Sequence, residues 1–572
     1  MPGLKFQSAT IKMPPAVTTS FIGEEEKAQV RAVVFGHLAG VVLAPTVKAL
    51  WDRRVFDLFG SADDWVEFDR IAQETRANRG YLRVALRLLA SCGWLKQQVE
   101  GGRARYALTA EGRVAVGTAP LLYGEALSFV AKAVFLEDFL FGASDRPVLP
   151  SLQELVRRSK ERWGLQPDAD AVVSRVRNQI REHLDGMLIG PAMVALARAE
   201  ILSQFERPVD VDAIAANRAS LSCILDLLAA QGWVALESTA RDKNSVSLTA
   251  CGRYAAQIAT SYGVTVSYLP LFDNVSTLMF GNSRIPRMDE SGVELLVNRG
   301  MNVWGSGGAH RTYFKKVDEI IVEIFNRPLN LQPRGICDMG CGDASFLEHL
   351  YFAVKNKTER GKVLDRHPLI LIGADFNKVA RRVAKQTLRK AGIPVYHVIP
   401  GDINRPAQLA SDLEELNLDI HDLLHVRSFL DHNRPYIPPA NYAGGTRLGK
   451  STGAFAYLGE EIACDELEEN LTRHLRRWAP YVGRFGLLVL ELHTLPPEVA
   501  AANLSRTPAV AYDGTHGFSD QYLVELPVFL DAAKEAGLRA DPRFQAKFPP
   551  SELATVSINF FTTAGDPFDA GL

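Results

Sequence analysis

From about Leu331 to the C-terminus, short apolar runs alternate with longer amphipathic stretches. The runs are GICDMG, LILIGADF, VYHVIPGD, LLHVRSFL, FGLLVLELH and TVSINFFTT. Apolar runs of this length between turn residues predict buried strands, and the amphipathic stretches predict helices. The alternation therefore predicts an α/β domain, with a mostly parallel sheet covered on both faces. Ligands of such sheets bind outside the carboxyl ends of the strands.

Two segments of the first half share one pattern of apolar positions, so this half contains a repeat. In each copy, leucines at helical spacing lead to a glycine and a tryptophan, and a strand, a polar turn and a second strand follow. The matching positions are Leu82, Leu86, Leu89, Gly93 and Trp94 in the first copy and Leu221, Leu225, Leu228, Gly232 and Trp233 in the second. Helices followed by a two-stranded wing are typical of winged-helix modules. We therefore expect a mostly helical first half with two winged-helix-like repeats.

These patterns divide the chain of 572 residues into four segments. Residues 1–20 are expected to form a flexible tail. Residues 21–150 and 151–290 are expected to contain the first and the second winged-helix-like repeat. Residues 291–572 are expected to contain the sheet.

Charge and composition argue against several classes of function. The net charge is −2, and neither repeat has the basic cluster that would neutralise DNA phosphates, so we expect no nucleic-acid partner. No uninterrupted apolar run approaches about 18 residues, which argues against a transmembrane helix. Six cysteines are too few for a disulfide scaffold and indicate a reducing compartment, the cytoplasm.

The sequence ICDMGCGDAS spans the end of the first strand and the turn into the next helix. Asp338 ends the strand, and Gly340 and Gly342 form the turn. Two missing side chains let the backbone approach a ligand closely, and glycine tolerates the φ angles that such a turn requires. The turn is therefore a candidate binding site.

Two further acidic residues lie at the next strand ends. Asp375 and Phe376 end the second strand, where a carboxylate suits ribose hydroxyl groups. Asp402 and Ile403 follow the third, where an acid beside an apolar residue suits the amino group and the ring face of adenine. The three acids together resemble the S-adenosylmethionine site of class I methyltransferases. The resemblance covers about residues 331–565 and implies a Rossmann-like sheet with S-adenosylmethionine as methyl donor.

Two histidines lie at the ends of the fourth and fifth strands, which are neighbours in the class I topology. His432 lies in SFLDHNRPY and His493 in LELH, and a third cluster, HGFSDQY, contains Gln521. One imidazole could act as a general base that deprotonates a hydroxyl nucleophile. Alternatively, both could bind a divalent or trivalent ion, Fe, Mn or Zn, with Gln521 or water completing the shell. Such an ion would polarise a carbonyl and stabilise an enolate.

A second resemblance indicates which type of methyl transfer to expect. SFLDHNRPY and LELH resemble the metal-dependent C-methyltransferases of natural-product pathways, such as phenylpyruvate and 2-ketoarginine methyltransferases, which share a winged-helix arm. NVWGSGGAHRTYF and HGFSDQY resemble the loading-module methyltransferases of apratoxin-type polyketide synthases, which methylate a malonyl unit on a carrier protein. The resemblance implies that His432 and His493 bind a metal, with Gln521 as a weaker third candidate. It also implies that Tyr313 helps to close the donor or substrate pocket.

The expected function is metal-assisted C-methylation of the carbon alpha to a carbonyl. The acceptor would be a 2-keto acid or a malonyl or β-keto thioester, free or on a separate carrier protein. His432, His493 and Arg427 are the candidate catalytic residues, because Arg427 lies near a strand end and could bind a substrate carboxylate. A metal-independent O-methyltransferase with a histidine base is the alternative. A regulator without enzymatic activity is a third hypothesis, which the charge distribution disfavours.

The repeated arm allows two expectations for assembly. Small-molecule methyltransferases often use such an arm for dimerisation, so a homodimer is one expectation. The other is that the two repeats mimic a dimer within one chain.

Overall fold

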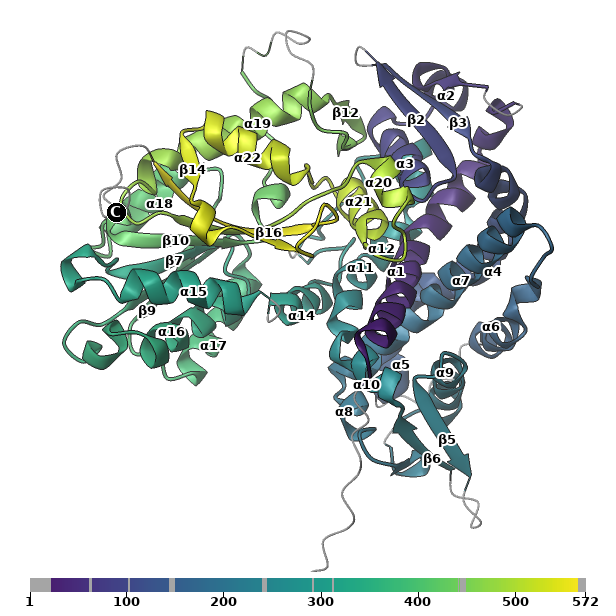
Figure 1. Ribbon diagram of the computed structural model, residues 1–572, viewed down its shortest axis with the longest axis horizontal. Helices are drawn as coiled ribbons and strands as arrows, with labels where there is room; N and C mark the ends of the chain where they lie inside the picture. Colours follow the sequence, from purple (N-terminus) through teal and green to yellow (C-terminus); the bar gives the residue numbers. More distant parts are fainter. Residues whose placement is uncertain are drawn as a thin grey trace, which may run out of the picture.

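The chain forms a helical arm, residues 24–280, and a sheet domain, residues 294–563, which lie side by side (Figure 1). A computed structural model describes residues 22–563 except 61–63, 101–102, 143–149, 215, 239–243, 291–292, 311–312, 441 and 443–448. The expected tail, residues 1–20, lies outside the described residues. The arm and the sheet domain meet at several helices in the middle of the molecule.

The sheet domain is built on one sheet of eight strands. Seven of them follow the order β14-β16-β13-β10-β7-β8-β9, and β15 pairs with β16. The five neighbouring strands β13, β10, β7, β8 and β9 are parallel to one another, and β16 is antiparallel to β13. The bounds are β7 Gly335–Met339, β8 Ile370–Asp375, β9 Tyr396–Pro400, β10 Leu423–Ser428, β13 Leu487–Leu492, β14 Leu538–Ala540, β15 Ala546–Phe548 and β16 Val556–Thr563. All six predicted strands are present, which confirms the predicted fold class, whereas the short β14 and β15 were not predicted.

Successive residues of the central strands face two separate apolar cores. Ile336 of β7 packs in the core shared with α15, α16 and α17, whereas its neighbour Cys337 packs in the core shared with α18, α19 and α22. This alternation is the two-residue period of a strand. The helices are α15 Phe314–Phe325, α16 Ser345–Lys357, α17 Lys378–Lys390, α18 Pro406–Glu414, α19 Cys464–Trp478 and α22 Leu526–Glu535. Both faces of the sheet are therefore covered, as the alternating pattern predicts.

The arm contains the two predicted winged-helix-like repeats. In each, a long helix precedes a three-stranded sheet, ordered β1-β3-β2 in the first and β4-β6-β5 in the second. The first comprises α1 Glu24–Asp52, β1 Val66–Glu67, α2 Phe68–Thr75, α3 Arg79–Ser91, β2 Leu95–Glu100, β3 Arg103–Leu108 and α4 Ala110–Ala133. The second comprises α7 Ala171–Arg198, α8 Ile201–Gln204, β4 Val209–Asp210, α9 Arg218–Ala230, β5 Val234–Ser238, β6 Asn244–Leu248 and α10 Ala250–Gln257. The repeated leucines of α3 and α9 are buried, so the shared pattern is a core pattern.

Short helices connect the repeats to each other and to the sheet domain. Between the repeats lie α5 Leu136–Phe141 and α6 Pro150–Lys160, and after them lie α11 Gly263–Ser267, α12 Leu269–Asp273, α13 Val275–Phe280 and α14 Arg299–His310. A Cβ at Gly305 of α14 would lie 2.7 Å from the Cα of Gly263 in α11. A backbone contact this close requires glycine at both positions and attaches α14 to the arm.

The helix α21, Ala509–Phe518, follows β13 in the sequence but packs against the arm. A Cβ at Gly514 would lie 1.9 Å from Val42 Cγ1 of α1, and a Cβ at Gly517 would lie 2.7 Å from Val84 Cγ1 of α3. Glycine therefore lets α21 approach both arm helices closely. The adjacent elements of the sheet domain are β11 Phe455–Tyr457, β12 Glu460–Ile462 and α20 Pro497–Ala501.

Two helices of the arm, α1 and α4, are long and apolar enough to cross a membrane by length and composition. In α1, 78% of the most apolar window is buried inside the protein, and in α4 the share is 39%. A core helix of a soluble protein passes the same test. These two helices are therefore weak evidence for a membrane span, and the expected absence of a membrane partner stays a prediction.

Candidate active site

The turn after β7 leaves space for a ligand beside its backbone. Gly340 and Gly342 have φ angles of +79° and +54°, which glycine adopts without strain. A Cβ at Gly342 would meet no atom within 4 Å, so the space beside it is open. Asp338 is 1% exposed, and its Oδ1 has no hydrogen-bond partner among the described residues. Burial, and next the charge of Asp375, raises the pKa of Asp338 well above its usual value. A donor group from a ligand would satisfy this buried oxygen.

Asp375 lies at the end of β8, next to the same turn. Its Oδ2 accepts a hydrogen bond from the backbone N–H of Gly342 at 3.0 Å, and its Oδ1 accepts one from that of Asn377 at 2.7 Å. Burial raises the pKa of Asp375, although these bonds and Arg299 oppose the rise. The adjacent Phe376 is 77% exposed. A fixed carboxylate beside an uncovered aromatic ring suits a ligand with a polar and an apolar part, such as a nucleoside.

The remaining residues predicted to bind S-adenosylmethionine lie at the same edge of the sheet. Asp402 and Ile403 follow β9, and Ile403 is 5% exposed. The ring of Tyr313 lies 6.0 Å from that of Phe429, which directly follows β10, and 4.8 Å from that of Phe548, centre to centre. The predicted donor-binding residues thus gather at the ends of the adjacent strands β7, β8 and β9 and beside β10.

His432, in the loop after β10, is held by the carboxylate of Glu491 in β13. Glu491 Oε1 accepts a hydrogen bond from His432 Nδ1 at 2.5 Å, and Oε2 accepts one from the backbone N–H of His432 at 3.1 Å. Both side chains are buried. The carboxylate acceptor requires the proton on Nδ1, so in the neutral form of the ring Nε2 carries the lone pair. Carboxylates orient both general-base histidines and metal-binding histidines in this way.

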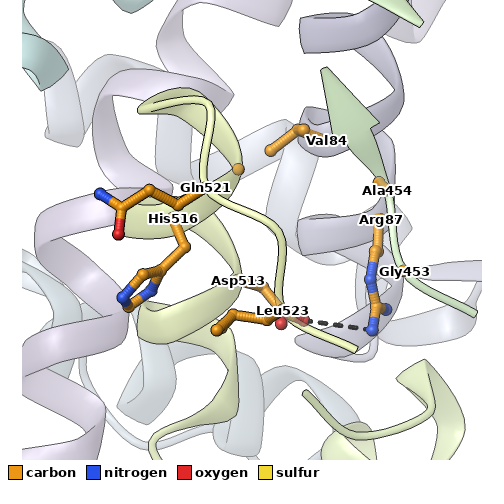
Figure 2. Close-up of a pocket in the computed structure, with 9 residues that line it drawn as sticks. Val84, Arg87, Gly453, Ala454, Asp513, His516, Gln521 and Leu523 are labelled. Atoms are coloured by element: carbon orange, nitrogen blue, oxygen red, sulfur yellow. Dashed lines mark ion pairs between the residues drawn. The ribbon is translucent and has the colours of Figure 1, made fainter. Parts of the chain in front are cut away.

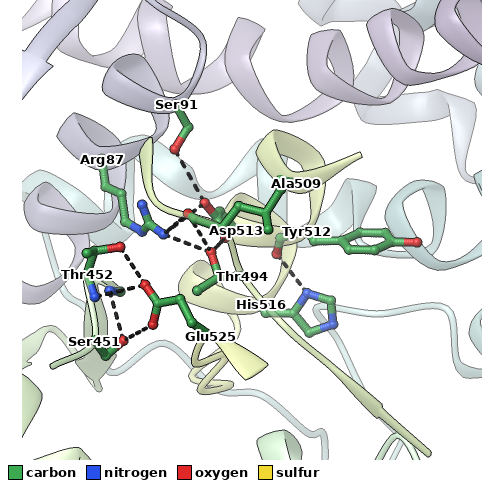
Figure 3. Close-up of polar contacts among 12 residues, drawn as sticks. Arg87, Ser91, Ser451, Thr452, Thr494, Ala509, Tyr512, Asp513, His516 and Glu525 are labelled. Carbon is green, nitrogen blue, oxygen red and sulfur yellow. Dashed lines mark hydrogen bonds and ion pairs between the residues drawn. The ribbon is translucent and has the colours of Figure 1, made fainter. Parts of the chain in front are cut away.

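A second imidazole, that of His516 in α21, lies beside His432. The two ring centres are 5.0 Å apart, and the ring planes are inclined at 79°. His516 Nδ1 donates to the backbone carbonyl of Tyr512 at 2.7 Å, so its Nε2 also carries a lone pair (Figure 3). Burial, and next the proximity of His432, lowers the pKa of His516 to about 3. The ring is therefore neutral near pH 7 and able to bind a cation.

Gln521 lies close to His516. Its backbone N–H donates to the carbonyl of His516 at 2.9 Å, and Figure 2 shows the two side chains on the same side of α21. Its amide nitrogen donates to Tyr268 Oη and to Ser519 Oγ, both at 2.8 Å. These two bonds fix the orientation of the amide and distinguish its nitrogen from its oxygen.

His493 does not have the free nitrogen that a metal ligand needs. Its Nδ1 donates to the carbonyl of Val524 at 3.2 Å, and its Nε2 accepts from the hydroxyl of Ser557 in β16 at 2.7 Å. The side chain is fully buried. Both ring nitrogens are thus engaged in hydrogen bonds within the protein, and the expectation that His493 binds an ion together with His432 stays a prediction. His516, not His493, is the imidazole in contact with His432.

Arg427 supports the loop that carries His432. Its Nη1 donates to Asp431 Oδ1 at 2.7 Å, and its guanidinium lies 4.1 Å from the ring centre of Trp478. His474 Nε2 also donates to Asp431 Oδ1, at 2.9 Å. Arg427 is 1% exposed. Its contacts are thus with the protein, and the predicted contact with a substrate carboxylate stays a prediction.

Comparison with known proteins identifies the domains of the chain. Family models match at residues 30–97, 185–282 and 294–559, and they describe the AprA N-terminal domain, the AprA winged helix domain and the AprA MT2-like domain. The chain is a methyltransferase, and its three matched domains are similar to those of AprA. The third match contains all the strand ends described above. No curated protein matches the sequence.

The solved structures similar to this chain are distant. The mitomycin 7-O-methyltransferase MmcR is 14% identical and covers 69% of this chain and 99% of its own, with a TM-score of 0.40. Human N-acetylserotonin methyltransferase in complex with SAM is 12% identical, covers 70% and 99%, and has a TM-score of 0.38. The CurJ carbon methyltransferase is 13% identical, covers 76% and 99%, and has a TM-score of 0.30. Structures this distant do not indicate which acceptor the chain methylates.

The residues at this edge of the sheet fit S-adenosylmethionine, because an unpartnered buried carboxylate oxygen and an open glycine turn adjoin an exposed aromatic ring. The spacing of two imidazoles beside this site is also compatible with one metal ion. Two imidazoles that bind one ion at about 2.1 Å place their ring centres about 5 Å apart, which is the separation of His432 and His516. The described residues contain no group of three His, Cys, Asp or Glu side chains suited to an ion. Gln521 or the acceptor would therefore complete the shell.

Sequence reasoning missed Glu491, and it gave no role to His516, the first residue of HGFSDQY. For Glu491 a signal existed, because the two-residue period of β13 places it on the same face as the candidate His493. For His516 no local signal existed, since the position of α21 depends on its contacts with the arm.

Proposed function

We propose that this methyltransferase transfers the methyl group of S-adenosylmethionine to a carbon alpha to a carbonyl, in natural-product biosynthesis. The acceptor would be a 2-keto acid or a malonyl or β-keto thioester, free or on a separate carrier protein. The observation that carries the proposal is the contact between His432 and His516, two imidazoles with fixed Nδ1 atoms and free Nε2 atoms near the methyl-donor site.

The buried residues around this pair suit a metal-assisted reaction. Glu491 holds the proton on Nδ1 of His432, and the carbonyl of Tyr512 does the same for His516, so both Nε2 atoms can bind a cation. His432, His516 and Gln521 would hold a divalent or trivalent ion, Fe, Mn or Zn. Such an ion supplies Lewis acidity, which makes a proton beside a carbonyl easier to remove. In the transfer, the proton of the acceptor carbon passes to a solvent base, the electron pair of the broken carbon–hydrogen bond attacks the methyl carbon, and the methyl–sulfur bond breaks to leave S-adenosylhomocysteine.

The test combines metal analysis with product identification. Protein purified without chelator is assayed with methyl-labelled S-adenosylmethionine and a panel of 2-keto acids, malonyl thioesters and acetoacetyl thioesters. We expect about one bound ion per chain, loss of activity in EDTA, and a product whose new methyl group is bonded to carbon by NMR. His432→Ala and His516→Ala should abolish metal binding, and Glu491→Gln should weaken it by about 10–100-fold. His421→Ala is the matched control, because His421 is an exposed histidine that stacks on Tyr481.

A second candidate is a metal-independent methyltransferase that uses His432 as general base, with a hydroxyl acceptor. The short bond between Glu491 and His432 favours it, because a carboxylate on Nδ1 strengthens an imidazole base. This candidate predicts full activity in EDTA, a methyl ether as product, and a requirement for His432 and Glu491 but not for His516. Activity that depends on all three residues and is lost in EDTA would exclude it.

A further inference from the structure

Helices α1 and α7 contact each other through equivalent residues of the two repeats. Each contains the pattern His-Leu-x-Gly, beginning at His37 in α1 and at His183 in α7. A Cβ at Gly40 would lie 2.2 Å from the carbonyl oxygen of His183, and a Cβ at Gly186 would lie 2.2 Å from the Cα of His37. Each glycine thus lies against the histidine of the other helix. Such reciprocal contacts are typical of a two-fold axis.

Two hydrogen bonds extend this symmetry to the rest of the arm. His37 Nδ1 bonds to Tyr262 Oη at 2.8 Å, and His183 Nδ1 bonds to Tyr123 Oη at 2.6 Å. Each tyrosine follows the wing of its own repeat, so each bond crosses from one repeat to the other. All four side chains are buried. The two repeats are therefore related as two subunits of a symmetric dimer would be.

The two repeats differ in what covers the face of the leucine helix on which Arg87 lies in α3 and Asp226 lies in α9. In the first repeat, Arg87 of α3 donates to Thr494 Oγ1 at 2.8 Å and pairs with Asp513 at 3.5 Å, and both partners belong to the sheet domain. The matching position of α9, one residue after its repeated leucine, is Asp226. It pairs with Lys160 of α6 at 2.7 Å. Thus α3 binds the sheet domain, whereas α9 binds α6.

The helix α6 covers the face of α9 that corresponds to the docking face of α3. Its apolar residues Leu152, Leu155 and Val156 are at most 4% exposed and belong to the core of the arm. In Figure 1, α6 and α9 lie side by side, away from the sheet domain. A second sheet domain could bind α9 only if α6 were displaced.

We infer that the second repeat is a built-in partner of the first. Two arms that would pair between the subunits of a symmetric dimer pair within one chain, and α6 closes the face that would receive a second sheet domain. The functional unit is therefore one chain with one active site. The surfaces of α1 and α7 that meet in this contact are not available to a second copy. This inference does not depend on the proposed reaction.

A disulfide across α1 and α7 tests whether they pair within one chain. A Cβ at Gly36 would lie 3.3 Å from the Cβ of Glu182, close to the separation of about 3.5–4.5 Å in disulfides. The full-length double variant Gly36→Cys, Glu182→Cys is oxidised and compared with each single variant on non-reducing gels. We expect an intrachain cross-link in the double variant only, and a light-scattering mass of 62.9 kDa for the unmodified protein.

Each other outcome overturns part of the inference. A disulfide that joins two chains would show that the arms pair between copies, and failure to cross-link would show that the two helices do not meet at this point. An intrachain cross-link combined with a light-scattering mass of two chains would disprove the claim that one chain is the functional unit.

Discussion

Replacing Gly514 by alanine should push α21, which carries His516, away from the arm. The added Cβ would lie 1.9 Å from Val42 Cγ1 and 3.1 Å from Leu88 Cδ1. Carbon atoms pack at about 3.5–4.0 Å, so one of the helices must move by more than 1 Å unless a side chain rotates. Val42 is β-branched and lies within α1, where its χ1 angle has one strongly preferred value. We therefore expect the collision to shift the helices rather than to rotate the side chain of Val42.

The expected change in the free energy of unfolding is the difference between two opposing effects. Alanine in a helix gains about 1 kcal/mol over glycine, whereas overpacking a core costs about 1–3 kcal/mol and sometimes more. Since this contact is far shorter than van der Waals distance, we expect a net loss of about 2 kcal/mol in the free energy of unfolding. Displacement of a catalytic group by about 1 Å can cost about 100-fold in rate. We therefore expect Gly514→Ala to lower methyl transfer by more than tenfold.

A double-mutant cycle separates this contact from general damage to the helix. Val42→Ala removes the atom that collides, so the pair Val42→Ala, Gly514→Ala should be more stable than the sum of the single effects, by about 1–3 kcal/mol. Gly117→Ala in α4 is the control, because Gly117 is exposed and its Cβ would meet no atom within 4 Å. Thermal unfolding and methyl transfer are measured for all four variants. Additive single effects, or a fully active Gly514→Ala, would refute this account of how α21 is positioned.

Two further predictions concern the arm. Burial lowers the pKa of His37 and of His183 to about 3, so below about pH 6.5 the unfolded chain binds protons that the folded arm does not. The free energy of unfolding should therefore fall with decreasing pH, by about 2 kcal/mol per histidine between pH 6.5 and 5. In melting curves recorded over this pH range, His183→Gln should make the fall less steep. An unchanged dependence on pH would contradict the conclusion that buried His183 stays neutral in the folded arm. Arg87→Met should destabilise the protein by about 3–5 kcal/mol, because it leaves Asp513 buried without its cation. Arg83→Met, one turn earlier in α3, breaks a looser and less buried pair with Glu461 of β12 at 3.7 Å and should cost about 1 kcal/mol or less. Equal losses in urea titrations would show that the burial of the Arg87–Asp513 pair is not what makes it important.

The sheet could be predicted because its signals are local. Each strand is a short apolar run, and the alternation with helices fixes both the parallel arrangement and the edge at which the strands end. Asp338, Asp375 and Asp402 could therefore be placed at one edge without any knowledge of packing. The arm could be predicted for a related reason, since its repeated leucines are buried in both copies. In both cases the period of the sequence decides which side of an element is buried.

The partner of His432 could not be predicted from strand adjacency alone. β10 and β13 are neighbours, as expected, and His493 does follow β13. The backbone N–H of His493, however, donates to Thr555 at 2.8 Å, and its ring bonds to Ser557. Both partners belong to the segment that contains the antiparallel strand β16. The position of a residue at a strand end thus fixes the edge but not the neighbour that its side chain contacts.

The geometry of the His432 and His516 pair depends on contacts between segments that are far apart in the sequence. Glu491 positions His432 from within the sheet, whereas His516 is positioned by α21, whose glycines lie against α1 and α3. Gln521 is oriented by Tyr268 of the arm. A chain without its arm would therefore keep the strand ends that suit S-adenosylmethionine, but it would lose the contacts that fix His516 and Gln521. On this physical ground the proposed active site includes the arm, and the proposed donor site and the proposed site of methyl transfer depend on different parts of the chain.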